Sequence, residues 1–337
     1  MQGSDTPSSN APPPLLAIDQ LTVQFQGERG WSSAVQDVSL RIDEGECVGL
    51  VGESGSGKSV TALSILRLHD ARSSRVQGAV RYRGEDVLRM SNRELRRLRG
   101  GEVAMIFQDP MSSLNPVLTI ADQIGETLRL HEQLSKVAAR RRAIELLELV
   151  RIPDAARRVD EYPHRLSGGM RQRVMIAIAM ACRPKLLIAD EPTTALDVTI
   201  QAQILELLRE LQTELSMAVL LITHDLGVIA QLAHRVVVMY AGQVIEEAPV
   251  ERLFDHPLHP YSEGLLRAIP PLDQDVHRLA AIPGHIPDPG QMPPGCRYAP
   301  RCALARASCR TTPPPLTSVA AAGASRCPVR LECEAAL

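Results

Sequence analysis

A glycine-rich loop between two apolar segments carries the residues whose chemistry is easiest to recognise. Residues 52–59 read G-E-S-G-S-G-K-S and lie between a strand-like apolar run and a helix-compatible segment. The spacing G-x-x-x-x-G-K-S is typical of a phosphate-binding loop. Glycines let the backbone turn N–H groups towards phosphate oxygens, lysine adds a positive charge, and the serine hydroxyl can ligate Mg²⁺. The sequence predicts a nucleotide site formed by Gly52, Glu53, Ser54, Gly55, Ser56, Gly57, Lys58, Ser59 and Val60.

Three more sets of polar side chains follow apolar runs of strand character. Gln108 follows one run, Asp190 and Glu191 end a second, and His224 follows a third. The carboxyl ends of parallel strands form the edge of an α/β sheet where ligands bind, so we expect these residues beside the phosphate loop. Asp190 would hold Mg²⁺ together with Ser59 and Gln108. Glu191 would act as general base on the attacking water, His224 would hydrogen-bond the γ-phosphate, and the loop lysine would complete the catalytic set.

A second anion-binding pattern lies further along the chain. Ser167 has N-cap chemistry, and Gly168 and Gly169 expose the backbone at the start of an apolar helix, so this turn can also bind an anion. Asp197 follows in a loop after the paired carboxylates and is expected to belong to the nucleotide site. Aromatic residues make up only 3% of the chain, so two near the predicted site stand out. Phe25 or Trp31 could stack on adenine, with ordinary packing as the alternative for both.

Composition limits the classes of protein to which the chain can belong. It has 337 residues, 45% hydrophobic and 23% charged, which is ordinary for a globular protein. A net charge of −2 argues against general nucleic-acid binding. No apolar run approaches the ~18 residues needed to span a bilayer. Residues 1–14 are polar and rich in proline and serine, as in a flexible tail rather than a signal peptide. A nucleotide site implies the cytosol, where the seven cysteines do not argue for disulfides.

The hydrophobic periodicity divides the chain into segments. Alternation over residues 15–25 and the run 34–42 predict antiparallel strands before the loop, and buried-type strands recur later. Helical periodicity from 119 to about 149 predicts a helical subdomain, placed at about 109–180, inserted in the sheet domain. We therefore expect a nucleotide-binding domain at 15–254. Residues 255–337 form a separate proline-rich extension, in which periodicity is lost after Ile269.

The order of these motifs resembles that of the ATP-binding-cassette (ABC) ATPases across residues 15 to about 250. The resemblance implies an α/β fold of P-loop NTPase type, with a mixed β-sheet core, an antiparallel β lobe, an inserted helical subdomain and here a small irregular cysteine-rich extension. It also implies ATP and Mg²⁺ as ligands and two cassettes facing head to tail, with the Ser167–Gly169 turn of one closing over the phosphate loop of the other. The sequence contains no internal repeat, so the second cassette must be another chain.

A closer resemblance extends beyond the cassette. The segments S-G-G-M-R-Q-R at 167–173, D-E-P-T-T-A-L-D at 190–197 and H-P-L-H-P-Y at 256–261 look like the D-type ATPase subunit of dipeptide/oligopeptide importers. The resemblance implies a heterodimer with a second ATPase subunit beneath two transmembrane permease subunits, which an extracytoplasmic peptide-binding protein supplies. It places the chain peripherally at the cytoplasmic face of the inner or plasma membrane. The predicted function is ATP hydrolysis that powers the import of di- or oligopeptides.

Other functions fit the sequence less well. DNA-repair relatives carry long heptad coiled coils between the phosphate loop and the Ser-Gly-Gly turn, and no sustained heptads occur here. Translation relatives carry two cassettes in one chain. A regulatory cassette that does not hydrolyse ATP would not need Glu191 and His224. An importer of another solute, such as nickel or glutathione, remains an alternative because other subunits choose the cargo.

Five of the seven cysteines fall in the last 42 residues. Their spacings fit zinc poorly, since zinc cysteines usually pair two to four residues apart. Disulfides conflict with the cytosol, and scattered unligated thiols are an open alternative. In the resembling family, some members hold a [4Fe–4S] cluster in the corresponding tract. The resemblance therefore implies such a cluster, with zinc as the lesser variant, on Cys296, Cys302, Cys309 and Cys327.

Overall fold

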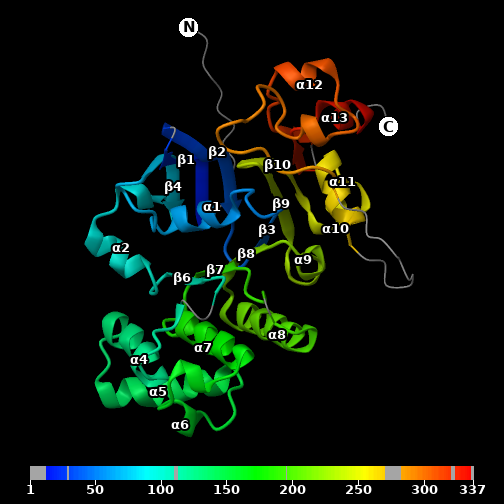
Figure 1. Cartoon of the computed structure of the whole chain (residues 1–337). Helices are drawn as coiled ribbons and strands as arrows, with labels where there is room; N and C mark the ends of the chain where they lie inside the picture. The colour runs from blue at the N-terminus through cyan, green and yellow to red at the C-terminus, as the bar shows by residue number, and fades with distance from the viewer. Residues whose placement is uncertain are drawn as a thin grey trace.

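The computed structural model of the chain describes residues 13–28, 30–109, 113–194, 196–269, 282–319 and 323–334 (Figure 1). The predicted tail at 1–14 lies almost entirely outside these ranges. Two sheets, a group of helices and a C-terminal extension make up the described residues, and the mixed α/β fold expected from the sequence is confirmed.

The main sheet contains eight strands in the order β11-β12-β10-β9-β3-β8-β7-β6. Its parallel part consists of β6 (Val103–Ile106), β7 (Leu186–Asp190), β8 (Ala218–Thr223), β3 (Cys47–Val51) and β9 (Arg235–Tyr240). Alternate residues of these strands contribute to two different hydrophobic cores, one on each face. Burial on both faces explains why these strands appear in the sequence as continuous apolar runs rather than alternating patterns.

The second sheet is antiparallel and packs on one face of the parallel strands. It contains β1 (Leu16–Gly27), β2 (Gly30–Ile42), β4 (Ser74–Tyr82) and β5 (Glu85–Asp86) in the order β2-β1-β4-β5. The inward residues of β1 alternate along the strand, as the sequence pattern predicts, except at an irregularity between Ile18 and Leu21. Helix α1 (Lys58–Ile65) contributes to the same core, so this sheet supports the helix that starts at the phosphate loop.

The helical subdomain lies at the opposite end of the molecule from the C-terminal extension (Figure 1). Its helices are α4 (Ile120–His131), α5 (Lys136–Leu149), α6 (Ala155–Arg158) and α7 (Gly168–Met180). Thr119, Ser135 and Ser167 cap three of them, each accepting a backbone N–H at the start of its helix. The described part of the cassette also contains α2 (Asn92–Leu98), α8 (Val198–Leu215) and α9 (Leu226–Leu232).

The C-terminal extension is more regular than its composition indicates. After β10 (Gln243–Pro249), the chain forms α10 (Val250–Asp255), α11 (Pro260–Arg267), α12 (Ala307–Thr311) and α13 (Pro328–Glu334). It also adds β11 (Thr317–Val319) and β12 (Gly323–Ser325) to the edge of the main sheet. Strands of three residues are too short to show a periodicity in the sequence. They form because β12 pairs with β10 and so provides hydrogen-bond partners for the backbone at the edge of the sheet.

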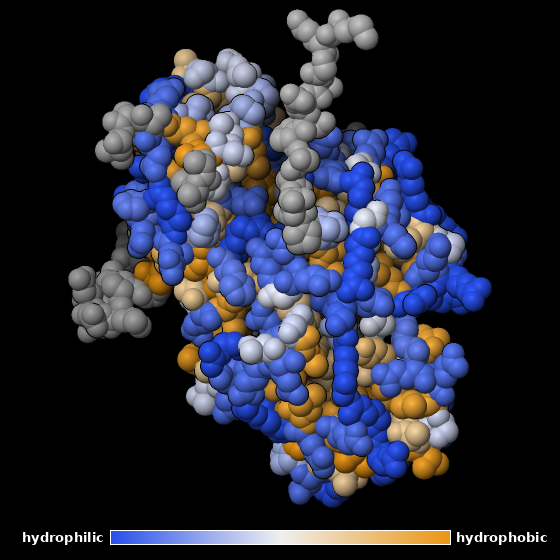
Figure 2. All heavy atoms as spheres, turned by 180° about the vertical axis from the view of Figure 1, so that it is seen from behind, coloured by the Kyte–Doolittle hydropathy of each residue, from blue (hydrophilic) through white to orange (hydrophobic). Residues whose placement is uncertain are grey.

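In the described part of the chain, we find no helix whose length and apolar character suit it to cross a membrane. The face shown in Figure 2 carries mainly hydrophilic residues, with hydrophobic residues scattered between them.

Candidate nucleotide site

The four adjacent parallel strands β3, β8, β7 and β6 bring the predicted residues together. The phosphate loop follows β3, His224 follows β8, Asp190 and Glu191 end β7, and Gln108 follows β6. All four strands run in the same direction, so their carboxyl ends share one edge of the sheet. Sheet topology therefore gathers side chains that are more than 160 residues apart in the sequence.

The loop conformation depends on glycine at two points. Gly52 has φ +152°, and a Cβ there would lie 2.2 Å from the carbonyl oxygen of Met239. Gly57 has φ +102° and caps helix α1, a backbone conformation that side chains disfavour. The backbone of this loop is therefore free to pass close to its neighbours and to a phosphate group.

Lys58 is nearly buried and its amine lies inside the loop. Nζ donates hydrogen bonds to the carbonyl oxygens of Gly52 (2.7 Å) and Glu53 (3.0 Å). Burial lowers its pKa, and the nearby carboxylates of Glu191, Asp190 and Glu53 act in the opposite direction. The loop therefore holds the amine through two backbone carbonyl oxygens, at the place where a phosphate would bind.

Ser59 and Asp190 form the arrangement expected for a magnesium site. Ser59 Oγ donates a hydrogen bond of 3.1 Å to Asp190 Oδ1 across 131 residues. Asp190 is only 4% exposed, and burial raises its pKa, although the hydrogen bond from Ser59 and the charge of Lys58 lower it. A hydroxyl and a carboxylate are the hard oxygen ligands that Mg²⁺ prefers, so the residues present fit this ion.

Glu191 lies at the centre of a hydrogen-bond network. Its Oε2 accepts from Gln108 Nε2 (2.9 Å) and Thr194 Oγ1 (2.8 Å), and its Oε1 lies 3.2 Å from His224 Nδ1. Burial acts to raise the pKa of Glu191, but the hydrogen bonds from Thr194 and His224 and the positive charges nearby lower it overall. The carboxylate is therefore held ionised, which is the form a general base needs.

The other expected residues are placed differently. Ser167 caps α7 by accepting the N–H of Met170, and Ser167 and Gly168 are exposed. Asp197 caps α8 by accepting the N–H of Ile200, and it is exposed as well. A Cβ at Gly169 would lie 2.8 Å from the Ile200 side chain, so the starts of α7 and α8 pack together. These residues form one exposed surface.

The aromatic candidates have protein partners. The half-buried ring of Phe25 meets His69 edge to face, with centroids 5.4 Å apart. The guanidinium of Arg75 lies 3.9 Å from the ring centroid of Trp31. Adenine stacking by either ring stays a prediction. The half-buried Val60, at the start of α1, offers its carbonyl oxygen to Ser64 and His69.

Sequence reasoning missed three residues that act on this site. Thr194 is three residues after Glu191, so its place in the turn could have identified it as a hydrogen-bond partner. Tyr261 and Arg301 reach Glu53 of the loop from the C-terminal extension. No local pattern marks these two, because more than 200 residues separate them from the loop.

The prediction of an iron–sulfur cluster is wrong, and so is its zinc variant. Among the residues that the structure describes, no group of three or more His, Cys, Asp or Glu side chains is placed to hold a metal ion. Cys296, Cys302, Cys309 and Cys327 are free cysteines that line one cavity of about 20 Å³. That volume admits about one water molecule, not a four-iron cube. Burial raises the pKa of the Cys296, Cys302 and Cys327 thiols above the ordinary value for cysteine.

Comparisons with known proteins agree with this geometry. The family model "ABC transporter" matches residues 35–194, and "Oligopeptide/dipeptide transporter, C-terminal region" matches residues 245–309. The dipeptide transport ATP-binding protein DppD of Escherichia coli (strain K12) is 53% identical over 313 residues, covering 93% of this chain and 96% of DppD. The oligopeptide transport ATP-binding protein AppD of Bacillus subtilis (strain 168) is 52% identical over 314 residues, covering 93% of this chain and 96% of AppD.

A solved structure has a similar cassette fold. The dimeric, post-hydrolysis state of the ATP-binding cassette MJ0796 bound to ADP and Pi is 30% identical, with a TM-score of 0.63, and the match covers 70% of this chain and 98% of that one. The motifs, the strand-edge site and these similarities lead to one conclusion: the chain belongs to the family of ABC transporter ATP-binding proteins that carry the oligopeptide/dipeptide transporter C-terminal region.

Proposed function

We propose that this chain hydrolyses ATP to power the import of di- or oligopeptides. The observation that carries the proposal is the hydrogen bonding of Gln108, Thr194 and His224 to Glu191, beside the Ser59–Asp190 pair. A general base and a metal-binding pair at the mouth of one phosphate loop are the parts that hydrolysis of a nucleoside triphosphate needs. The relatives named for dipeptide and oligopeptide transport support the cargo class.

Lys58, Ser59 and Asp190 receive the MgATP. Lys58 Nζ exchanges its carbonyl partners in the loop for β- and γ-phosphate oxygens, which attract a cation more strongly. Loop N–H groups and the start of α1 bind the remaining phosphate oxygens. The Ser59 hydroxyl and the Asp190 carboxylate would hold Mg²⁺, which would supply positive charge to neutralise the phosphates.

Glu191 takes the proton of the attacking water. Thr194 and His224 lower the pKa of its carboxylate, and with Gln108 they orient it. Exchange of Glu191 for glutamine keeps the shape of the side chain but removes the base. We expect turnover to fall at least about a hundredfold, within the range of general-base catalysis, while MgATP binding persists. Phosphate release and nucleotide affinity of the purified transporter measure the two quantities separately. Turnover near the wild-type rate would refute the base assignment.

A second cassette completes the site. Ser167 and Gly168 are exposed at the N-terminus of α7, where the helix dipole attracts anions, and Asp197 and Val198 are exposed beside them. The dimeric form of the cassette MJ0796 supports a pair of cassettes. We assign the second position to a sister ATPase subunit, because the chain resembles one of the two ATPase types of these importers.

The assembly we propose places this heterodimer at the cytoplasmic face of the inner or plasma membrane. It works beneath two permease subunits, and an extracytoplasmic peptide-binding protein delivers the cargo to them. Within the chain, residues 15–254 act as the nucleotide-binding domain, with the helical subdomain at about 109–180, and residues 255–337 form the extension.

Cargo can be tested on the assembled transporter. In proteoliposomes with the binding protein, di- and oligopeptides should stimulate ATP hydrolysis and enter the lumen. Nickel or glutathione, the alternative cargoes, should do neither. Stimulation by one of these and not by peptides would replace the proposed cargo and leave the ATPase assignment intact.

A further inference from the structure

Glu53 belongs to the phosphate loop, yet its side chain is held by the C-terminal extension. Arg301 Nη1 lies 2.6 Å from Glu53 Oε2, and Arg301 Nη2 lies 3.0 Å from Glu53 Oε1. This two-point geometry is the strongest form of an ion pair between these groups. The side chain of Arg301 is 5% exposed and that of Glu53 is 30% exposed, so solvent screens the pair only in part.

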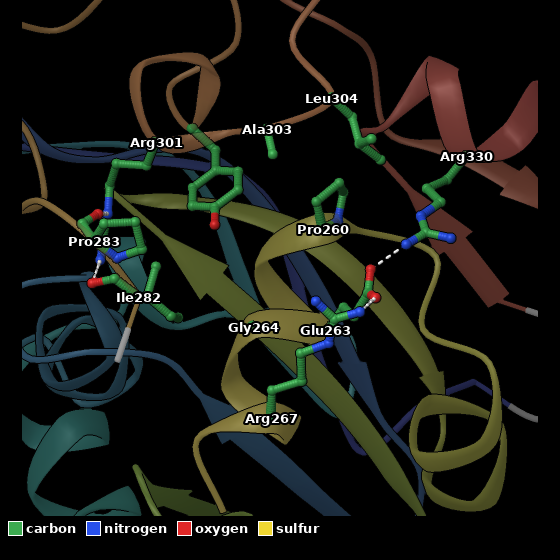
Figure 3. Close-up of a pocket in the computed structure, with 11 residues that line it drawn as sticks. Pro260, Glu263, Gly264, Arg267, Ile282, Pro283, Arg301, Ala303, Leu304 and Arg330 are labelled. Atoms are coloured by element: carbon green, nitrogen blue, oxygen red, sulfur yellow. Dashed lines mark hydrogen bonds and ion pairs between the residues drawn. The ribbon is translucent and has the colours of Figure 1, made fainter. Parts of the chain in front are cut away.

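Arg301 is itself fixed in place by its surroundings. Its Nε donates to the carbonyl oxygen of Pro283 (2.8 Å), and Nη2 donates to that of Ile282 (3.2 Å). Figure 3 shows the guanidinium at one side of a cavity of about 380 Å³, on the side away from Glu263 and Arg330. The extension itself therefore holds the Arg301 side chain in place, so that it loses little conformational freedom when it pairs with Glu53.

The extension also holds the backbone of the loop. The N–H of Glu53 donates a hydrogen bond of 2.8 Å to the hydroxyl of Tyr261 on α11. Tyr261 is fully buried in a cluster of aromatic rings with Tyr240 and Tyr298. This N–H is thus bonded to the extension, which fixes the direction in which the rest of the loop continues.

A second contact from the same segment supports the underside of the loop. Arg297 donates to the carbonyl oxygen of Ala241 and to the amide oxygen of Gln36. The next residue along the β9–β10 turn, Gly242, donates its N–H to the carbonyl oxygen of Ser56 in the loop (2.8 Å). Two arginines four residues apart in the extension therefore reach the loop, one directly and one through a turn.

Because Glu53 is negatively charged, its ion pair with Arg301 matters for the binding of a triphosphate. Glu53, Asp190 and Glu191 are all close enough to Lys58 to influence its charge. Asp190 and Glu191 have proposed roles in metal binding and water activation, whereas a free carboxylate at Glu53 would only repel a triphosphate. The two-point pairing with Arg301 cancels that negative charge where the anion must bind.

We propose that Arg301 is a positioning residue for ATP binding: it holds and neutralises Glu53, so that the phosphate loop is fully formed only when the C-terminal extension is in place. The inference rests on the proposed assignment of residues 52–59 as the triphosphate site. On this proposal, the segment around Arg301 contributes to the nucleotide site without binding a metal ion. The C-terminal extension thereby becomes part of the ATP-binding machinery.

The test measures the affinity of the full-length chain for the magnesium complex of AMP-PNP, a non-hydrolysable ATP analogue, by titration calorimetry. Arg301→Gln should weaken binding about tenfold, because it exposes the triphosphate to an uncompensated carboxylate. Adding Glu53→Gln to that variant should restore affinity to within about threefold of wild type, because the repulsive charge is gone. The deficit of the Arg301→Gln variant should also shrink as salt is raised, since salt screens the repulsion.

Two further variants separate charge from folding. Arg301→Lys keeps the charge but cannot form the two-point contact, so its affinity should fall between those of the wild type and the glutamine variant. Arg306→Gln is the matched control, because it breaks a 2.6 Å ion pair between exposed side chains elsewhere in the extension, with Glu332, and should leave affinity unchanged. In the assembled transporter, Arg301→Gln should raise the KM for MgATP and leave kcat within about twofold.

Some outcomes would overturn the proposal. Unchanged affinity in the Arg301→Gln variant would show that Glu53 needs no compensation. A double variant that binds no better than Arg301→Gln would show that the arginine matters only to folding. Lys58→Ala tests the underlying site separately: if that variant binds the nucleotide as tightly as wild type, the assignment of the loop fails, whatever Arg301 does.

Discussion

Glu246 joins the main sheet to the C-terminal extension, and its pKa makes this contact testable through the pH dependence of stability. The residue lies on β10, is completely buried, and accepts the N–H of Leu258 at 2.6 Å through Oε1. Burial raises its pKa from 4.5 to about 7, while the bonds to backbone groups and the charge of Arg252 oppose the rise. In the unfolded chain the carboxyl returns to its ordinary value. Folding is therefore linked to proton uptake by this group.

The sign and size of the effect follow from that difference. Between pH 4.5 and about 7 the folded chain holds a proton on Glu246 that the unfolded chain has lost, so this group makes stability fall as pH rises. At about 1.4 kcal/mol per pH unit, the full interval amounts to about 3 kcal/mol. Below pH 4.5 both states are protonated, and above pH 7 both are ionised, so the contribution is flat outside the window.

The variant Glu246→Gln isolates this contribution. Glutamine can still accept the Leu258 N–H, but it cannot ionise. Buried His259, whose pKa is lowered to about 3, also makes stability depend on pH, but it is present in both proteins and cancels in their difference. We expect the variant to gain about 3 kcal/mol relative to wild type between pH 4.5 and 8. Urea unfolding followed by circular dichroism at several pH values gives this difference. A difference that stays constant over the range would refute the reasoning.

Three more outcomes follow from single contacts. Thr194→Val removes a hydrogen bond that lowers the pKa of Glu191, so the acid limb of the pH–rate profile should move to higher pH; Thr194→Ser, which keeps the hydroxyl, should not move it. Ser59→Ala removes the hydroxyl that bonds Asp190, and the Mg²⁺ concentration for half-maximal ATPase activity should rise about tenfold or more, as expected on loss of one ligand; an unchanged Mg²⁺ dependence would exclude Ser59 as a ligand. Gly323 has φ +105°, and a Cβ there would lie 1.9 Å from the carbonyl oxygen of Glu247. Gly323→Ala should therefore lower the free energy of unfolding by about 2 kcal/mol or more through backbone strain, and an unchanged urea midpoint would show that β12 can shift away from β10 without loss of stability.

The local chemistry of the site could be predicted from the sequence. The spacing of Gly52, Gly57 and Lys58 specifies a loop conformation that few other residue types can adopt, and apolar runs of five or six residues specify buried strands. Each of these signals depends on neighbours within a few residues. For the same reason, the N-cap role of Ser167 could be anticipated from the glycines and the apolar helix that follow it.

The tertiary structure decided what the chain brings together over long distances. The pairing of Glu53 with Arg301 spans 248 residues, and neither residue shows a local pattern that indicates the other. The cysteine tract illustrates the opposite outcome: four thiols at suggestive positions line a cavity too small for the cluster expected from them. Local sequence limits which conformations a segment can adopt, whereas the distance between two side chains and the volume between them depend on the path of the whole chain, which only the packed structure determines.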